Sequence, residues 1–137
     1  MKKSGILHPQ LSRVIAQLGH TDSIVVADAG LPVPEGCERI DLAYAPGEPP
    51  FLGVLAAVLG EMEVEGATIA RELESGDPPF RDAVVAQLEA LPKVARAGID
   101  HVSHEEFKRL TASARAVIRT GETTPYANVI LRSGVFF

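Results

Sequence analysis

His20 is a side chain that could do acid–base chemistry, and it follows Gly19 where an amphipathic segment ends and we expect a helix to stop. Exposed carbonyl groups at the C-terminus of a helix favour a positive charge, so an imidazole there can donate a proton near neutral pH. A histidine in this position is also an ordinary solvent-exposed residue at a helix end. The position alone leaves both interpretations open.

Asp28 ends an apolar, β-branched run over residues 24–27 and precedes Ala29 and Gly30. Ligands of open α/β sheets bind in the crevice beyond the carboxyl ends of the strands, so this carboxylate would point into such a crevice. An aspartate before a turn also accepts hydrogen bonds from loop amides. A ligand contact and a turn acceptor are therefore equal interpretations of Asp28.

His101 and His104 are three residues apart, a spacing that can place two imidazoles on one metal when the backbone is helical throughout. Here the two histidines straddle the junction of a predicted strand and a predicted helix, and no third ligand is evident. We predict no metal site, a hydrogen-bonding role for His104 at the crevice, and a structural role for His101.

A turn made of Pro125, Tyr126, Ala127 and Asn128 precedes another predicted strand. It offers a phenol, an amide and free backbone groups, a set that suits a polyhydroxylated ligand. By itself the segment is an ordinary turn. The sequence has no Gly-rich phosphate loop, no His-Glu-x-x-His, no cysteine pair and no Gly-x-Ser-x-Gly, which argues against several large enzyme classes.

The elements that must position these residues follow from the spacing of apolar side chains. Helices are predicted over residues 9–19, 50–60 and 78–90, with a further one that begins at the capping box 103–106. Strands are predicted over residues 24–27, 38–42, 61–65, 99–102, 116–119 and 129–131. Residues 61–65 are ambiguous, because glutamate favours helices whereas strict alternation has the period of a strand, and we give the period more weight. The order predicts a three-layer α/β/α domain with a largely parallel or mixed sheet.

The composition sets limits on the class of protein. The chain has 137 residues, 46% of them hydrophobic, so we expect one core and a single domain over residues 1–137. A formal net charge of −5 offers no surface for nucleic acid. The apolar stretch 51–60 is about half of what a membrane span needs, so we expect no membrane insertion. The lone Cys37 and the absence of a signal-peptide-like start favour a cytoplasmic location.

The C-terminus ends in Phe136 and Phe137, in a chain with only 5% aromatic residues. Two phenylalanines left in water would be an unusual use of apolar surface. We therefore predict that this terminus is packed, with another subunit as one candidate partner.

Three segments resemble the ribose pyranase and fucose mutarotase family. They are Gly-His-Thr-Asp at 19–22, Asp-Ala-Gly-Leu-Pro-Val-Pro at 28–34 and Pro-Tyr-Ala-Asn at 125–128. The resemblance continues through most of the chain, including Val-Ile-Arg-Thr-Gly-Glu at 117–122. The related L-fucose mutarotases share the histidine, the aspartate and a similar Tyr-Ala-Asn segment. The continuation of Asp28 through Pro34 favours D-ribose as the substrate.

The resemblance implies an activity, a set of site residues and an assembly. It implies that His20 is the proton donor. It implies that the sugar is bound by Asp28, His104, Tyr126, Ala127 and Asn128. It also implies a ring-shaped homodecamer with sites near the subunit boundaries.

The implied reaction interconverts the pyranose and furanose forms of a free sugar, which is general acid–base work. A histidine with an ordinary pKa of about 6.5 can give and take protons at neutral pH, so we expect no metal and no coenzyme. Two other classes stay open. One is a non-catalytic sugar-binding module linked to ribose transport, and the other is an assembly scaffold without a small-molecule site.

Overall fold

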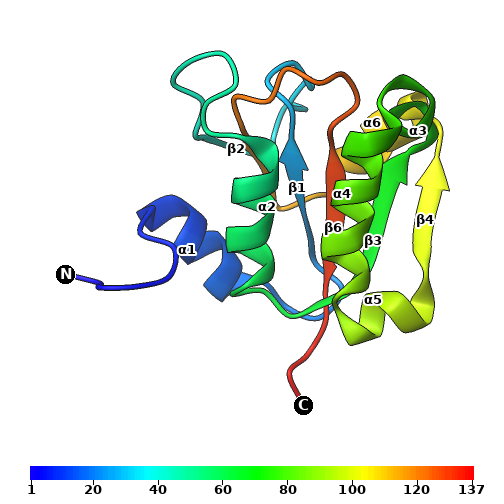
Figure 1. Ribbon diagram of the computed structural model, residues 1–137. Coiled ribbons are helices and arrows are strands. Elements are labelled where there is room, and N and C mark those ends of the chain that lie inside the picture. The colour runs from blue at the N-terminus through cyan, green and yellow to red at the C-terminus, as the bar shows by residue number, and fades with distance from the viewer.

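A computed structural model describes all 137 residues, and a six-stranded mixed sheet forms its centre (Figure 1). The strands are β1 (Ser23–Ala27), β2 (Glu38–Asp41), β3 (Val64–Ala70), β4 (Ile99–Val102), β5 (Ala116–Arg119) and β6 (Val129–Ser133). Their spatial order is β2-β5-β1-β6-β3-β4. Strand β6 is antiparallel to both its neighbours, and every other adjacent pair is parallel. All strands except β6 therefore end at the same edge of the sheet.

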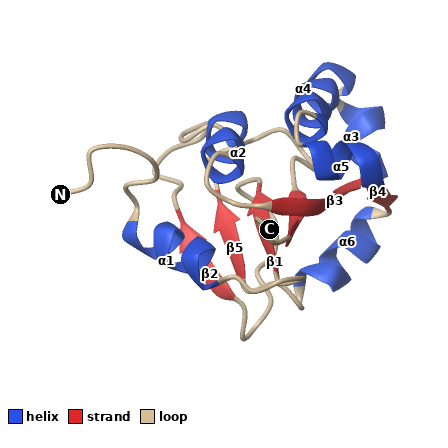
Figure 2. Cartoon of the chain, turned by 90° about the horizontal axis from the view of Figure 1, so that it is seen from below, coloured by secondary structure: helices blue, strands red, loops and turns tan.

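Helices cover both faces of the sheet, but unequally (Figure 2). They are α1 (Pro9–Gln17), α2 (Phe51–Leu59), α3 (Arg71–Gly76), α4 (Pro78–Glu89), α5 (Pro92–Ala97) and α6 (His104–Thr111). Helices α2, α4 and α5 lie over one face, where 22 buried residues form the main core. Helix α6 lies over the other face, where Phe107 packs into a cluster of only seven. The predicted three-layer α/β/α arrangement is confirmed, with one layer much thinner than the other.

The predicted helices agree with the structure to within a few residues. Helix α4 has Asp77 as its N-cap, with the carboxylate accepting from the amide of Phe80 at 3.0 Å. In α6 the predicted cap is present, because the Ser103 hydroxyl accepts from the Glu106 amide at 3.1 Å. Helices α3 and α5 were not predicted. Each has only six residues, too few for an apolar repeat to appear.

The strand predicted at residues 61–65 is wrong over its first half. Strand β3 begins only at Val64 and continues to Ala70, while residues 61–63 form the turn after α2. The alternation arose because Met62, in the turn, and Val64, at the start of the strand, are both buried in the main core, at 6% and 3% exposure. A period of two over so few residues does not distinguish a strand from a turn that points two side chains inward.

The prediction of a packed C-terminus is wrong for the single chain. Phe136 and Phe137 are each 89% exposed, and their rings contact one another edge to face at 5.2 Å between centroids. The chain is tied down only as far as Val135, whose carbonyl accepts from the Lys93 ammonium group. No helix in the structure has the length and apolar character needed to cross a membrane.

Candidate functional site

Asp28 and Asn128 meet at the edge of the sheet where β1 ends and β6 begins, because these neighbouring strands run in opposite directions. The Asn128 side chain accepts from the Asp28 amide at 2.8 Å through Oδ1 and donates to Asp28 Oδ2 at 3.1 Å through Nδ2. Asn128 is fully buried. The other carboxylate oxygen of Asp28 accepts from the Gly30 amide at 2.9 Å, as an Asx turn does. The turn role of Asp28 is thus present, and each of its oxygens keeps a further lone pair for a ligand.

Tyr126 and His104 lie at the same edge and contact each other through their rings, edge to face, with 5.0 Å between centroids. Tyr126 has a φ of +65°, a strained conformation for a bulky residue, and its carbonyl accepts from the Asn128 amide at 2.8 Å. The Nδ1 atom of His104 is buried without a hydrogen-bond partner. An unpaired buried nitrogen of this kind costs free energy, and no protein group compensates that cost here.

Arg119 supports this edge and was not singled out from the sequence. Its Nε donates to the carbonyl of Ala29 at 2.9 Å, and its Nη1 contacts both oxygens of Asp41, at 3.0 and 3.2 Å. It thereby ties the loop after β1 to the end of β2. The signal that could have found it is the one that found Asp28, a charged residue at the carboxyl end of an apolar strand.

Glu72 and Glu122 also hold the edge together. Glu72, on the unpredicted helix α3, accepts from the His104 amide at 2.8 Å. The carbonyl of Glu122 accepts from the Ala29 amide at 2.9 Å, and its carboxylate accepts from the hydroxyl of Thr124 at 3.0 Å. These bonds fix the loops that carry the predicted sugar-binding residues.

His20 lies at the opposite edge of the sheet, because it precedes β1 whereas Asp28 follows it. A strand of five residues is about 16 Å long, so within one chain His20 is separated from the cluster around Asp28 by more than the length of a monosaccharide. In Figure 1 this is the lower end of the sheet, where α1 and the C-terminus also lie. The fold thus brings together Asp28, His104, Tyr126, Ala127 and Asn128, and leaves His20 apart.

Hydrogen bonds nevertheless hold the backbone around His20 in place. Asp22 Oδ2 accepts from the Gly19 amide at 2.9 Å, and the Thr21 amide donates to the carbonyl of Ser133 at 2.9 Å. The bond from Gly19 and the ion pair with Arg115 hold the pKa of Asp22 below its usual value. Thr21 has a φ of +70°, a strained conformation for a β-branched residue. Strain of this kind persists only where surrounding bonds hold the backbone, as the bonds to Asp22 and Ser133 do here.

The imidazole of His20 contacts a carboxylate rather than the end of a helix. Helix α1 ends at Gln17, so the predicted helix over 9–19 is too long, and its carbonyl groups are not the partner of His20. Instead, Nε2 of His20 lies 2.9 Å from Oε2 of Glu65, and 55% of the His20 side chain is exposed. This bond holds the pKa of Glu65 below its usual value, and Arg132 adds to the effect.

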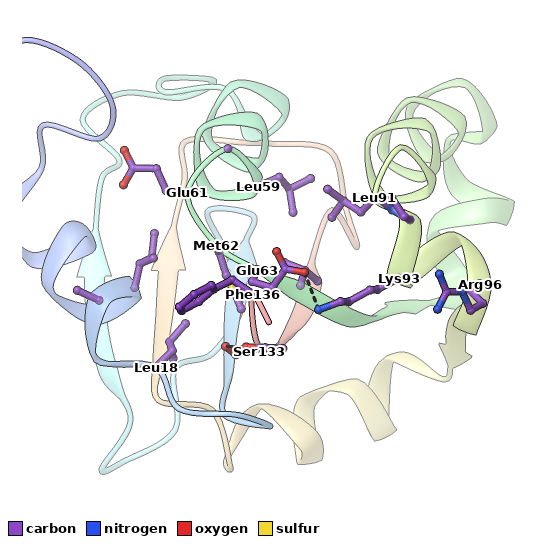
Figure 3. A pocket seen from close by; sticks show the side chains of 16 residues that line it. Leu18, Leu59, Glu61, Met62, Glu63, Leu91, Lys93, Arg96, Ser133 and Phe136 are labelled. Atoms are coloured by element: carbon purple, nitrogen blue, oxygen red, sulfur yellow. Dashed lines mark hydrogen bonds and ion pairs between the residues drawn. The ribbon is translucent and has the colours of Figure 1, made fainter.

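The largest cavity does not coincide with either group of residues. It measures about 770 Å³ and lies at the His20 end of the sheet, where Figure 3 shows Leu18, Met62 and Phe136 around it and the ion pair between Lys93 and Glu63 within it. None of the predicted site residues lines it. A hollow of about 330 Å³ lies at the other edge, beside Arg119. No group of three potential ligands is arranged to hold a metal ion.

The fold and this distribution of polar groups define a class: a mixed α/β protein with a hydrogen-bonding cluster for a small polar ligand at the carboxyl edge of its sheet. The chain belongs to the RbsD / FucU transport protein family, which matches residues 1–136. The predicted resemblance is thereby confirmed.

Several relatives are similar over the full length. The D-ribose pyranase of Laribacter hongkongensis is 57% identical to this chain, with all of both chains covered. The structure of Bacillus subtilis RbsD complexed with D-ribose is 47% identical, covers both chains fully and superposes with a TM-score of 0.92. The fucose mutarotase of Streptococcus pneumoniae in complex with L-fucose is 25% identical, covers 96% of this chain and 95% of its own, and has a TM-score of 0.81.

Proposed function

We propose that this protein is a D-ribose pyranase, an isomerase that interconverts the pyranose and furanose forms of free D-ribose. The observation that carries the proposal is the pair of Asp28 and Asn128, in which each carboxylate oxygen of Asp28 keeps a lone pair for a sugar hydroxyl, with the rings of His104 and Tyr126 at the same edge. Full-length identity of 57% to a pyranase, against 25% to a fucose mutarotase, favours D-ribose over L-fucose. We also propose that residues 1–137 form one domain, which works in the cytoplasm without metal or coenzyme.

The reaction needs one proton to be delivered and another to be removed. Opening of the pyranose breaks the bond between the anomeric carbon and the ring oxygen, which gains a proton while the anomeric hydroxyl loses one. The free carbonyl is then attacked by the neighbouring hydroxyl, which loses its proton as the carbonyl oxygen becomes protonated. His20 carries out these proton transfers, which raises the reaction rate on the order of 10²–10⁴-fold. The sugar is held by Asp28, His104, Tyr126, Ala127 and Asn128.

His20 must come from a neighbouring copy of the chain, because it and Asp28 lie at opposite edges of one sheet. Its side chain is more than half exposed, so it is available to a second copy. A closed ring joins such complementary edges head to tail. We therefore propose a homo-oligomer, a decamer by family resemblance, in which each site combines the cluster of one subunit with the histidine of the next.

The first experiment is saturation-transfer NMR on equilibrated D-ribose with the wild type and with His20→Ala. We expect the wild type to speed the exchange between the pyranose and furanose signals. In the variant, this protein-dependent exchange rate should fall on the order of 10²–10⁴-fold. Unchanged folding of the variant, checked by its thermal transition, keeps the comparison meaningful. Full exchange in His20→Ala would show that another group donates the proton.

A mixing experiment tests the shared site. His20→Ala and Asp28→Ala subunits, each inactive alone, are unfolded together, reassembled and assayed. If sites form between subunits, about a quarter of the randomly formed boundaries combine an intact His20 with an intact Asp28, and about a quarter of the wild-type exchange returns. A site made within one chain would give no recovery.

A second candidate is a sugar-binding module that does not catalyse, and the family description as a transport family is the observation that favours it. Binding of D-ribose without faster exchange would support this candidate.

Faster exchange of L-fucose than of D-ribose would instead favour the mutarotase alternative.

A further inference from the structure

Glu65 is the only side chain that contacts the imidazole of His20 through a hydrogen bond in the structure. We propose that Glu65 is a positioning residue that holds Nε2 of His20 in its protonated form and so leaves Nδ1 as the nitrogen that exchanges the proton with the sugar. This inference rests on the proposed function for its catalytic consequence. The contact itself can be tested without any assay of activity.

The chemistry of the contact decides which atom carries the hydrogen. An ionised carboxylate only accepts hydrogen bonds, so the Nε2 atom at 2.9 Å from Glu65 Oε2 must carry the hydrogen. In the neutral imidazole, Nδ1 then has the free lone pair and acts as the base. In the protonated ring, Nδ1–H is the acid. The low pKa of Glu65 keeps the carboxylate ionised at neutral pH.

Strand β3 is irregular at Glu65. The pairing of β3 with β6 shifts between Val64 and Gly66, so Glu65 is the extra residue of a bulge. A bulge leaves its extra residue out of the regular ladder and changes the direction of the side chain. The irregularity therefore falls on the one residue of β3 that reaches His20.

The carboxylate of Glu65 is itself held in place. Its second oxygen, Oε1, accepts from Nε of Arg132 at 3.3 Å. Arg132 reaches it across Gly66, where a Cβ atom would lie only 2.8 Å from the guanidinium group. The glycine thus makes room for an arginine that fixes Glu65. The arrangement of histidine, carboxylate and a second fixed partner is the one that sets a ring tautomer.

The test combines the tautomer with the rate, using Glu65→Gln on the full assembled protein. Long-range ¹H–¹⁵N NMR at a pH where the His20 ring is neutral should report the Nε2–H tautomer in the wild type. A carboxamide can donate as well as accept, so the variant should lose this preference. Ribose exchange should fall about 10- to 100-fold, if the range known for the hydrogen-bond partner of a metal-ligating histidine also applies to His20.

The matched control is Glu63→Gln, which removes a carboxylate two residues away that pairs with Lys93 and does not contact His20. In this variant, the tautomer of His20 and the rate of ribose exchange should equal those of the wild type. A wild-type His20 with hydrogen on Nδ1, or a Glu65→Gln variant with unchanged tautomer and rate, would overturn the inference. If the wild type gave no exchange at all, the proposed function would fail, while the tautomer would still decide the role of Glu65.

Discussion

The two edges of the sheet are built in opposite ways. At the edge after β1, Asn128 is fully buried and joined to Asp28 by two hydrogen bonds, and Tyr126 packs against His104. At the edge before β1, His20 projects from a turn with more than half of its side chain exposed and one carboxylate as its partner. The residues proposed to orient the sugar are held by hydrogen bonds and packing, whereas the residue proposed to transfer protons stays accessible and has one hydrogen-bond partner for its ring.

The largest difference that this comparison predicts is in stability. Asn128→Ala should lower the free energy of unfolding by about 2–4 kcal/mol, because the amide and one carboxylate oxygen of the half-buried Asp28 each lose a partner, at about 1–2 kcal/mol for each group. His20→Ala should change it by less than about 0.5 kcal/mol, as exposed residues do. Urea denaturation of the two variants measures both. Equal losses would mean that the two edges are not built differently.

The strained turn beside His20 predicts a smaller effect of the opposite sign. Thr21 adopts a φ of +70°, which asparagine tolerates better than a β-branched residue. Thr21→Asn should therefore raise the free energy of unfolding by up to about 1 kcal/mol, within the usual cost of such strain. The control is Thr123→Asn, an exposed threonine without a positive φ. If Thr123→Asn raised the free energy of unfolding, or Thr21→Asn lowered it, the backbone at Thr21 would not be strained.

The smallest effect concerns acid sensitivity. The pKa of Asp22 in the folded protein lies below its usual value of about 3.8, because its carboxylate accepts from Gly19 and pairs with Arg115. A lowered folded-state pKa stabilises the protein above the unfolded value, and this stabilisation is lost as the pH falls through the folded value. The stability of the wild type should thus drop more steeply below about pH 4 than that of Asp22→Asn. If the urea midpoints of the wild type and of Asp22→Asn changed by the same amount over this pH range, Asp22 would not hold the His20 turn.

Most of the fold could be predicted because its signals are local. The helical repeat of apolar residues found α1, α2 and α4, and β-branched runs found β1 and β5. Helices α3 and α5 are too short to show a repeat, and the alternation at residues 61–65 combined a turn with the start of β3. These elements are decided by packing against the sheet, which no short window of sequence contains.

The residue types of the candidate site were determined by the sequence alone, as were its positions at the ends of strands: Asp28, His104, Tyr126, Ala127 and Asn128 all follow or precede an apolar run. Only the tertiary structure decided that β6 runs antiparallel between β1 and β3, which brings Asn128 to Asp28 across 100 residues of sequence. It also decided that His20 faces Glu65 at the far edge. The reason is physical: side-chain chemistry and periodicity are written locally, whereas the direction and neighbours of a strand are set by which long-range pairing buries the most apolar surface.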